Sequence, residues 1–178
     1  MKNFGYILRL TLVLFLITAV VAGLLGAVNL LTKDRIAENT KQKAENAMRE
    51  VLAADSYESM TLNDQNKADG ITEAYLCDKG YIVRLNTVGF GGAIDMMVGI
   101  DFEGKVTGIS IISHAETASL GANCTREDFR SQFVGANEDL SVTKDGGTID
   151  ALTGATVTSR AVTSGVNVAL AFVKEVQG

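Results

Sequence analysis

The chain lacks proline and tryptophan altogether and contains one histidine and two cysteines. The cysteines, Cys77 and Cys124, form no C-x-x-C pair, which excludes a zinc ribbon and a dithiol redox motif. We expect buried thiols, with one disulfide as the alternative in an oxidising compartment. His114 and Glu116 form an H-x-E pattern, but the P-C-x-x-C segment of zinc deaminases is missing. We therefore predict no metal site and a structural histidine at a strand end.

Common nucleotide-binding and catalytic signatures are also missing. There is no Walker lysine motif and no nucleophile elbow. The glycines of 89–92 resemble a dinucleotide loop, but Ile94 stands where a further glycine is required. Residues 144–150 resemble a calcium loop, yet Ser141 and Leu152 occupy the positions of its first and last carboxylates. We predict a turn there.

Basic residues are outnumbered, with 16 Lys and Arg against 21 Asp and Glu, and the net charge is −5. Such a chain is a poor partner for nucleic acid. The content of 47% hydrophobic and 21% charged residues excludes a disordered chain and leaves an apolar surplus. Once the segment that carries this surplus is set aside, the remaining length suits one domain.

The apolar surplus lies at the amino terminus. Residues 10–31 carry no charged side chain, and about 20 such residues cross a bilayer core as a helix. A cleaved signal peptide is the alternative, but the run continues beyond the roughly 7 to 15 residues of a signal-peptide core. Ala19, Gly23 and Ala27 share one helix face, which favours close approach of a partner helix in the membrane.

The charges that flank this span leave its orientation open. Lys2 and Arg9 precede it, and more lysines and arginines follow between residues 33 and 49. A positive-inside count therefore favours a cytoplasmic domain, although the rule weakens for long translocated domains. Apolar residues from Ile36 to Leu52 recur at helical spacing, which predicts a stem helix that continues to about residue 53.

Beyond a polar stretch at 55–70, which we predict to be a loop, the hydrophobic period becomes that of strands. Alternation begins near Tyr75 and continues over 81–86 and 94–101. A further strand is expected at 106–112, after a turn at Glu103 and Gly104. The pattern predicts an antiparallel sheet.

Helical signals dominate the rest of the chain. Thr125 is expected to cap a short helix that carries Phe129 and Phe133. This helix should end at Gly135, and residues 140–143 are expected to form a strand. The clearest helix is the last one, whose apolar stripe runs from Val162 to Val173, with Thr158 or Ser159 as its cap.

The predicted fold class is therefore α+β. A tail and transmembrane helix occupy residues 1–31, and a stem helix occupies 32–55. Residues 56–178 form a domain in which an antiparallel sheet is closed by the carboxy-terminal helix.

Residues 150–159, Asp-Ala-Leu-Thr-Gly-Ala-Thr-Val-Thr-Ser, can carry chemistry. Gly154 and Ala155 keep side-chain bulk away, and four hydroxyls precede or enter the final helix. The free N–H groups at a helix start attract phosphate, so this loop is a plausible anion site. The residues alone leave a second interpretation open, a Ser/Thr-rich loop that merely caps the helix.

This segment resembles the flavinylation motif of the FMN-binding domain family, D-x-x-[S/T]-G-A-T. All its fixed positions are met, by Asp150, Thr153, Gly154, Ala155 and Thr156. In that family a flavin transferase, with FAD as donor, joins FMN through a phosphodiester to the last threonine of the motif. The resemblance implies a covalent FMN on Thr156, and it implies that Asp150 matters for recognition by the transferase.

A second block strengthens the resemblance. Residues 89–94, 98–101 and 114–121 resemble the family pattern GYGG…VGID…H-x-ETPGLG, with Ala118 and Ser119 in place of its proline and glycine. The flavin contacts expected on this basis are Glu116, Thr117, Leu120, Thr153, Gly154, Ala155 and Thr158. Alternatively, Glu116 is a buried carboxylate that ties down its own loop.

With its amino-terminal span, the chain is most similar to the G subunit of Rnf-type ferredoxin:NAD oxidoreductase complexes. The C subunit of sodium-pumping NADH:quinone reductase is an alternative, as is a non-redox membrane-anchored scaffold. The resemblance implies an electron relay coupled to Na⁺ or H⁺ transport, with no turnover by the isolated chain. It also implies other membrane subunits and a flavin transferase as partners, and an inner-membrane location with the domain outside the cytoplasm.

Overall fold

A computed structural model describes residues 4–137 and 139–178. Lys2, one of the charges counted before the span, lies outside the described residues. The chain divides into two compact units, one that ends at Gln42 and one from Lys43 to Gly178. Each unit is described by itself.

The first helix, α1 (Phe4–Val51), makes up the described part of the first unit and enters the second. Its described side chains up to residue 42 are exposed, and its most apolar window has a mean hydropathy of 2.6. Among the described residues, this is the one helix long and apolar enough to cross a membrane. Thr11 and Thr18 each donate a hydroxyl proton to a carbonyl one turn back, at 3.0 Å, so neither needs water as a partner.

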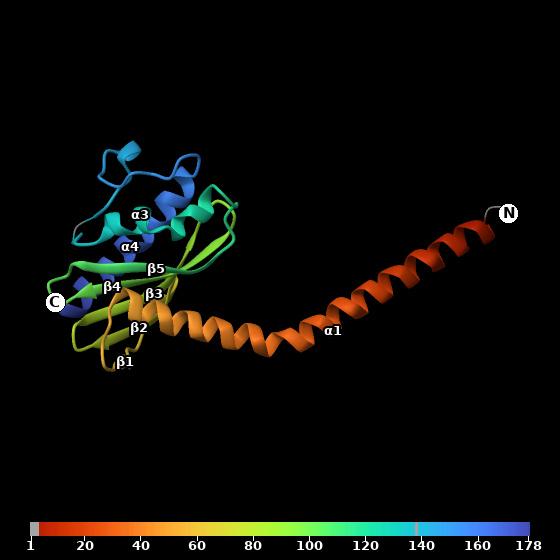
Figure 1. Cartoon of the computed structure of the whole chain (residues 1–178), viewed down its shortest axis with the longest axis horizontal. Helices are drawn as coiled ribbons and strands as arrows, with labels where there is room; N and C mark the ends of the chain where they lie inside the picture. The colour runs from red at the N-terminus through yellow and green to blue at the C-terminus, as the bar shows by residue number, and fades with distance from the viewer. Residues whose placement is uncertain (1–3, 138) are drawn as a thin grey trace. The chain divides into compact units, whose positions relative to one another are not determined.

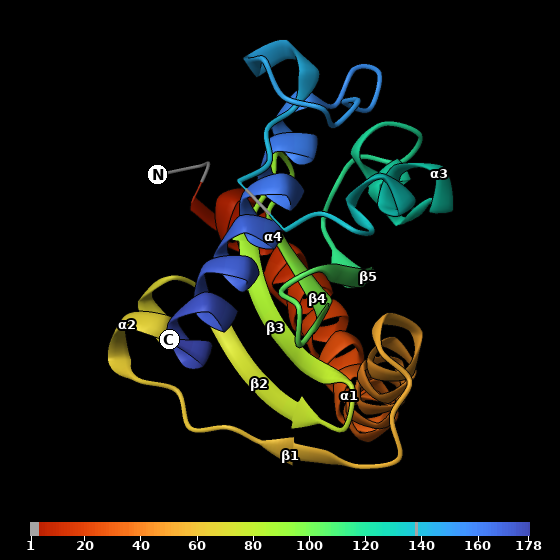
Figure 2. The same cartoon turned by 90° about the vertical axis from the view of Figure 1, so that its left-hand side faces the viewer.

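The second unit is built on an open sheet of five antiparallel strands in the order β1-β2-β3-β4-β5 (Figures 1 and 2). The strands are β1 (Tyr57–Ser59), β2 (Ile71–Cys77), β3 (Gly80–Val88), β4 (Ala93–Asp101) and β5 (Val106–His114). The predicted turn between the last two strands is present, with Gly104 in a left-handed conformation (φ 77°). The predicted α+β class and antiparallel sheet are confirmed.

The prediction that residues 55–70 form a loop is wrong. The stretch contains β1, which extends the sheet beside β2, and helix α2 (Asp64–Ala68). Asn63 caps α2 by accepting from the backbone N–H of Asn66 at 2.7 Å, and the Asn66 side chain accepts from Asn63 N at 3.1 Å. Two asparagines thus make the reciprocal cap that Ser/Thr with Glu/Gln usually make.

Helix α4 (Thr156–Gln177) packs along one face of β3 and β4 (Figure 2). Its predicted apolar stripe is buried against the sheet, as expected for an amphipathic helix on a core. The buried residues that form this side of the core include Val83, Leu85, Met96, Val98, Val162, Val166, Ala169, Leu170 and Val173.

The opposite face of the sheet is covered by the end of α1. Ala47, Val51 and Leu52 form a buried cluster with side chains of the sheet. Gly99 permits this contact, because a side chain there would collide with the carbonyl of Val51. Thr107 donates its hydroxyl to the same carbonyl at 2.6 Å. The carboxy-terminal part of the predicted stem is therefore part of the domain core, and α1 ends at Val51, before the predicted helix end near residue 53 and the predicted stem limit at residue 55.

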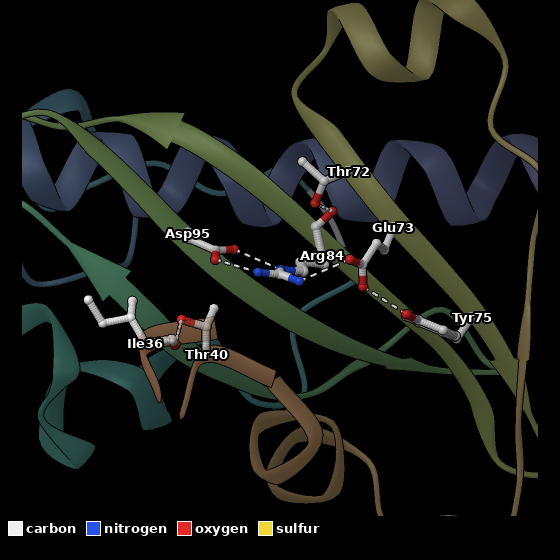
Figure 3. Close-up of polar contacts among 7 residues, drawn as sticks. All are labelled: Ile36, Thr40, Thr72, Glu73, Tyr75, Arg84 and Asp95. Atoms are coloured by element: carbon white, nitrogen blue, oxygen red, sulfur yellow. Dashed lines mark hydrogen bonds and ion pairs between the residues drawn. The ribbon is translucent and has the colours of Figure 1, made fainter. Parts of the chain in front are cut away.

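A polar network lies on β2, β3 and β4 (Figure 3). Arg84 donates to both carboxylate oxygens of Asp95, at 3.0 and 2.8 Å, and to Glu73 at 3.0 Å. Tyr75 donates to Glu73 at 2.7 Å, and burial together with this bond raises the pKa of Tyr75 to about 12. Because Arg84 and Asp95 are mostly covered, the two-bond pairing compensates the cost of taking their charges out of water.

Short helical segments connect β5 to α4: η1 (Gly121–Thr125), α3 (Glu127–Arg130), η2 (Ser131–Phe133) and η3 (Thr143–Asp145). The predicted pair Phe129 and Phe133 is buried, with ring centres 5.5 Å apart. Thr125 is not the cap, because its hydroxyl donates to Ala122 O and α3 begins after Arg126. The predicted single helix to Gly135 is wrong, because α3 ends at Arg130 and η2 at Phe133, although the chain does turn at Gly135 with φ 84°.

Two further expectations are settled by the path of the chain. The strand predicted at 140–143 is absent from the described structure, where Val142 makes a single bridge to Ile149 before η3 begins.

Cys77 and Cys124 are free and buried in different clusters, Cys77 with the end of α1 and Cys124 with α4. The disulfide alternative is therefore wrong.

Candidate functional site

The motif loop leads into an uncapped helix start. α4 begins at Thr156, and its N-cap residue is Ala155, which offers no side-chain acceptor. The prediction that Thr158 or Ser159 caps the helix is wrong, because both lie inside its first turn. The first N–H groups of α4 are thus without a side-chain cap, which suits an anion.

Two of the four hydroxyls in the motif are already engaged in the interior. Thr158 is 1% exposed and donates to the Glu116 carboxylate at 2.5 Å. Ser159 is fully buried, donates to Ala155 O at 3.0 Å and accepts from Leu152 N at 2.9 Å. Only Thr153, which is exposed, and Thr156, which is half-buried, remain within reach of another molecule.

Within the part of the chain that the structure describes, Thr156 has one side-chain partner, Lys144 of η3. The Lys144 ammonium donates to Thr156 Oγ1 at 2.9 Å. Sequence analysis missed Lys144, since its approach to Thr156 depends on the path of the intervening loop and no local spacing signals it. The structure therefore places a cation at the hydroxyl that the family motif singles out.

Glu116 joins three segments of the site. One carboxylate oxygen accepts from Gly91 N at 2.9 Å and the other accepts from Thr158, and the side chain is largely buried. A side chain at Gly121 would collide with both Glu116 and Thr158. This pairing ties the glycine loop after β3 and the loop after β5 to the start of α4. Glu116 also borders the cavity described next, so it can contact a ligand through its remaining exposed edge.

A cavity of about 410 Å³ opens between these segments. Its lining is mainly apolar, and its volume lies in the roughly 300 to 1,000 Å³ range of small-molecule sites. Most of the predicted contacts meet here: Glu116, Thr117, Leu120, Gly154, Ala155, Thr156 and Thr158. Gly121, Phe90 and Val157 complete the lining, and the last two are exposed at its rim, 75% and 47% respectively. Neither was predicted as a contact, although Phe90 occupies the aromatic position of the family's glycine block.

Cys124 lies beside this site but is unsuited to nucleophilic chemistry. It is fully buried, and burial together with the nearby Glu116 charge raises its pKa to about 11. The thiol is therefore protonated at neutral pH. Among the described residues, no group of three His, Cys, Asp or Glu side chains is placed to hold a metal ion.

Asp150 and Thr153 line a separate, neighbouring hollow of about 470 Å³. The Gln132 side chain fixes Asp150 through its backbone: it accepts from Asp150 N at 2.7 Å and donates to Asp150 O at 3.4 Å. The Asp150 residue is exposed, and its carboxylate makes no hydrogen bond to another described residue. The predicted set is thus divided between two adjacent surfaces.

The loop at 117–120 keeps a glycine-type geometry without glycine. Ser119, at the family's glycine position, has φ 64°, the one positive φ of a non-glycine residue among those described. Leu120 N donates to Thr117 O at 3.2 Å, and Asn123 donates to Ser119 O at 3.2 Å. The turn is therefore formed, at the cost of backbone strain that a side chain brings in this region.

A small-molecule cavity beside an uncapped helix start, with the motif threonine at its edge, defines the class: this is an FMN-binding domain. The family model of the FMN-binding domain matches residues 89–171, and that of the RnfG N-terminal region matches residues 1–51.

Curated relatives narrow the family further. The G subunit of a proton-translocating ferredoxin:NAD(+) oxidoreductase complex from Clostridium ljungdahlii is 38% identical over 164 residues, covering 86% of this chain and 85% of that protein. The G subunit of the Na(+)-translocating complex from Acetobacterium woodii is 37% identical, over 92% of this chain and 90% of that protein. The G subunit of an ion-translocating oxidoreductase complex from Methanosarcina acetivorans is 33% identical over the full length of both. The chain belongs to the family of G subunits of these ion-translocating oxidoreductase complexes.

A solved structure shows the same fold. The crystal structure of the C subunit of the Na(+)-translocating NADH-quinone reductase from Parabacteroides distasonis superimposes with a TM-score of 0.59, over 84% of this chain and 98% of that one. At 17% identity, this likeness concerns the fold alone.

Proposed function

We propose that the chain is a membrane-anchored electron carrier in which FMN is esterified through its phosphate to Thr156. The observation that carries this proposal is the state of the hydroxyls in the motif loop. Thr158 and Ser159 are buried and bonded within the protein, whereas Thr156 lies at the edge of the cavity and its one side-chain partner is an exposed lysine. Thr153, the other accessible hydroxyl, lines the neighbouring hollow instead.

The residues present fit an FMN with its phosphate at the start of α4. The uncapped N–H groups and the Lys144 ammonium suit the phosphate, and the apolar part of the cavity suits a flat aromatic ring system. When bound, FMN supplies the one- and two-electron chemistry, while the protein fixes its position and environment. Glu116, Thr117 and Leu120 would border the ring, with Glu116 holding the surrounding loops together.

Attachment is a phosphoryl transfer in which FAD is the donor. Thr156 Oγ1 forms the new bond to phosphorus, the bond from phosphorus to the adenylate half breaks, and AMP leaves. The hydroxyl proton passes to a base, which we assign to the flavin transferase. The exposed Asp150 carboxylate, held by Gln132 but unpaired itself among the described residues, is the part of the motif we expect the transferase to contact.

Membership of the family supports a proposal for the complex and for the location of the domain. We propose that residues 10–31 span the inner membrane, that the stem is limited to residues 32–42, and that the unit from Lys43 to Gly178 carries the flavin outside the cytoplasm. The other membrane subunits of the complex would be its electron-transfer partners and would couple transfer to Na⁺ or H⁺. A covalent tether suits that side, because a lost cofactor could not easily be replaced there. Protease added to spheroplasts should therefore digest the domain, and protection of the domain would contradict this orientation.

The attachment is tested by expressing the full chain with a flavin transferase, denaturing it and measuring in-gel flavin fluorescence. Wild type and the Thr153→Ser variant, which keeps the hydroxyl that the motif requires at this position, should fluoresce, and Thr156→Val should be dark. Fluorescence of Thr156→Val would overturn the site. A colourless wild type under these conditions would favour a non-redox scaffold.

A further inference from the structure

A lysine stands at the hydroxyl proposed to receive the flavin. Lys144 Nζ lies 2.9 Å from Thr156 Oγ1, and this is the one side-chain hydrogen bond that either residue makes among those described. No described carboxylate lies within ion-pair distance of Lys144. In addition to hydrogen bonds from Arg160, its charge helps to lower the pKa of the adjacent Asp145, but no described carboxylate is bonded to the ammonium, which can therefore meet a further anion.

The loop that carries Lys144 is fastened to the helix that carries Thr156. Asp145 accepts two hydrogen bonds from Arg160 of α4, at 2.7 and 2.6 Å. These bonds hold the pKa of Asp145 below its usual value. Asp145 and Arg160 satisfy each other in a two-bond pair, so the neighbouring cation, Lys144, is the one left for Thr156.

The backbone of the loop is closed as well. Thr143 N donates to Ile149 O at 2.8 Å, and Gly147 N donates to Val142 O at 3.1 Å. Gly146 turns the chain with φ 87°. The position of Lys144 above the start of α4 thus follows from a closed loop anchored at both its base and its side.

We infer that Lys144 is a positioning residue for flavin attachment: its ammonium orients Thr156 Oγ1 before transfer and pairs with the phosphodiester afterwards. The inference rests on the proposed function of Thr156. A lysine that donates to a lone pair of the hydroxyl oxygen leaves the O–H proton free to depart. After transfer, the phosphodiester carries one negative charge, which the same ammonium and the N–H groups of α4 can share.

The experiment measures attachment as a rate. Purified full-length chain in detergent, free of flavin, is incubated with purified flavin transferase and FAD, and covalent flavin is followed by fluorescence and intact mass. Lys144→Met should load roughly tenfold more slowly than wild type, the worth of one charge-assisted hydrogen bond. Lys144→Arg should recover part of the rate. The matched control is Lys105→Met, because Lys105 is an exposed lysine whose ammonium donates to the nearby Glu103 carboxylate.

A second readout separates pairing with the phosphodiester from contact with the transferase. In loaded protein, the ³¹P resonance of the phosphodiester should shift in Lys144→Met relative to wild type and stay unchanged in Lys105→Met. Denaturant unfolding of flavin-free Lys144→Met should match wild type, which excludes misfolding as the cause. A slow rate with an unchanged ³¹P resonance would assign Lys144 to the transferase interface and overturn the inference.

Failure of the inference and failure of the proposed function give different results. Equal loading rates for wild type and Lys144→Met, with Thr156→Val unlabelled, would refute the role of Lys144 alone. Labelling of Thr156→Val would refute the attachment site, whatever Lys144 does.

Discussion

The two halves of the motif loop lie in opposite environments. Residues 154–158 border the apolar cavity, where Thr158 is buried against Glu116 and Ala155 is buried at the helix start. Residues 150–153 border the neighbouring hollow, where Asp150 and Thr153 are exposed. We call these the enclosed half and the open half.

This difference suggests a division of labour within one short sequence. Buried, fully paired polar groups hold a fixed geometry, since any displacement leaves them without partners. An exposed carboxylate on an anchored backbone is free to meet another protein. The enclosed half is therefore suited to hold a cofactor and the open half to be recognised by the enzyme that attaches it. Apart from Thr156 itself, substitutions in the enclosed half should then act mainly on stability, and substitutions in the open half should act mainly on flavin loading.

The largest effect is expected in the enclosed half. Glu116→Ala removes the acceptor of both Gly91 N–H and the Thr158 hydroxyl and should lower the free energy of unfolding by about 2 to 5 kcal/mol. Glu116→Gln keeps the shape and one carbonyl oxygen, so it should cost clearly less. Denaturant unfolding of the flavin-free chain measures the stability of both variants. Equal stability of Glu116→Ala and wild type would contradict the role of Glu116 in holding the loops to the start of α4.

The open half should respond in loading but not in stability. Asp150→Asn removes the exposed charge and should slow flavin attachment roughly tenfold to a hundredfold, while unfolding stays as in wild type. Asp78→Asn, at another exposed aspartate, is the control. The rate assay with transferase and FAD gives the answer, and an unaffected rate would remove Asp150 from recognition.

Gln132, which anchors the backbone of the open half, should have smaller effects on both stability and flavin loading. Gln132→Ala frees the backbone groups of Asp150 and should cost about 0.5 to 1.5 kcal/mol in unfolding free energy. Loading should fall less than in Asp150→Asn, because the carboxylate remains but is held less firmly. Gln65→Ala, which breaks an exposed bond to Asp69, is the comparison. Loading by Gln132→Ala at the wild-type rate would show that the anchor is dispensable.

The smallest effect concerns the strained turn between the two surfaces. Ser119→Gly relieves a left-handed conformation that costs a side chain about 1 to 2 kcal/mol, but glycine gains freedom in the unfolded chain worth roughly 0.5 to 1 kcal/mol. The net gain in stability should lie between zero and about 1.5 kcal/mol. Ser119→Ala keeps the strain and should show no such gain. A shift in denaturant midpoint measures both, and destabilisation of Ser119→Gly would mean that the Ser119 side chain contributes to the fold.

Regular elements with long apolar periods could be predicted from the sequence. The strands of the sheet and the stripe from Val162 to Val173 are buried as their periodicity indicates. β1 has only three residues, too few for alternation to be visible, and α2 depends on an unusual asparagine cap. The cap of α4 was assigned three or four residues too late, because Thr158 bonds to Glu116 and Ser159 bonds to the loop instead.

The site could be predicted as far as a family motif extends. Glu116 and Thr156 come to one cavity although 40 positions separate them in the chain, and the motif blocks anticipated both. Lys144 and Gln132 are outside those blocks, and their contacts with Thr156 and Asp150 depend on where the loops fold. Side-chain contacts of this kind leave no periodic signal in the sequence.

The central claim is that one hydroxyl among four carries the flavin. Peptide mapping by tandem mass spectrometry of the chain expressed with its transferase tests this most directly. The account predicts FMN phosphate on Thr156 and unmodified Thr153, Thr158 and Ser159. Flavin phosphate on any of those three residues, or a peptide without flavin from a fully folded chain, would contradict it.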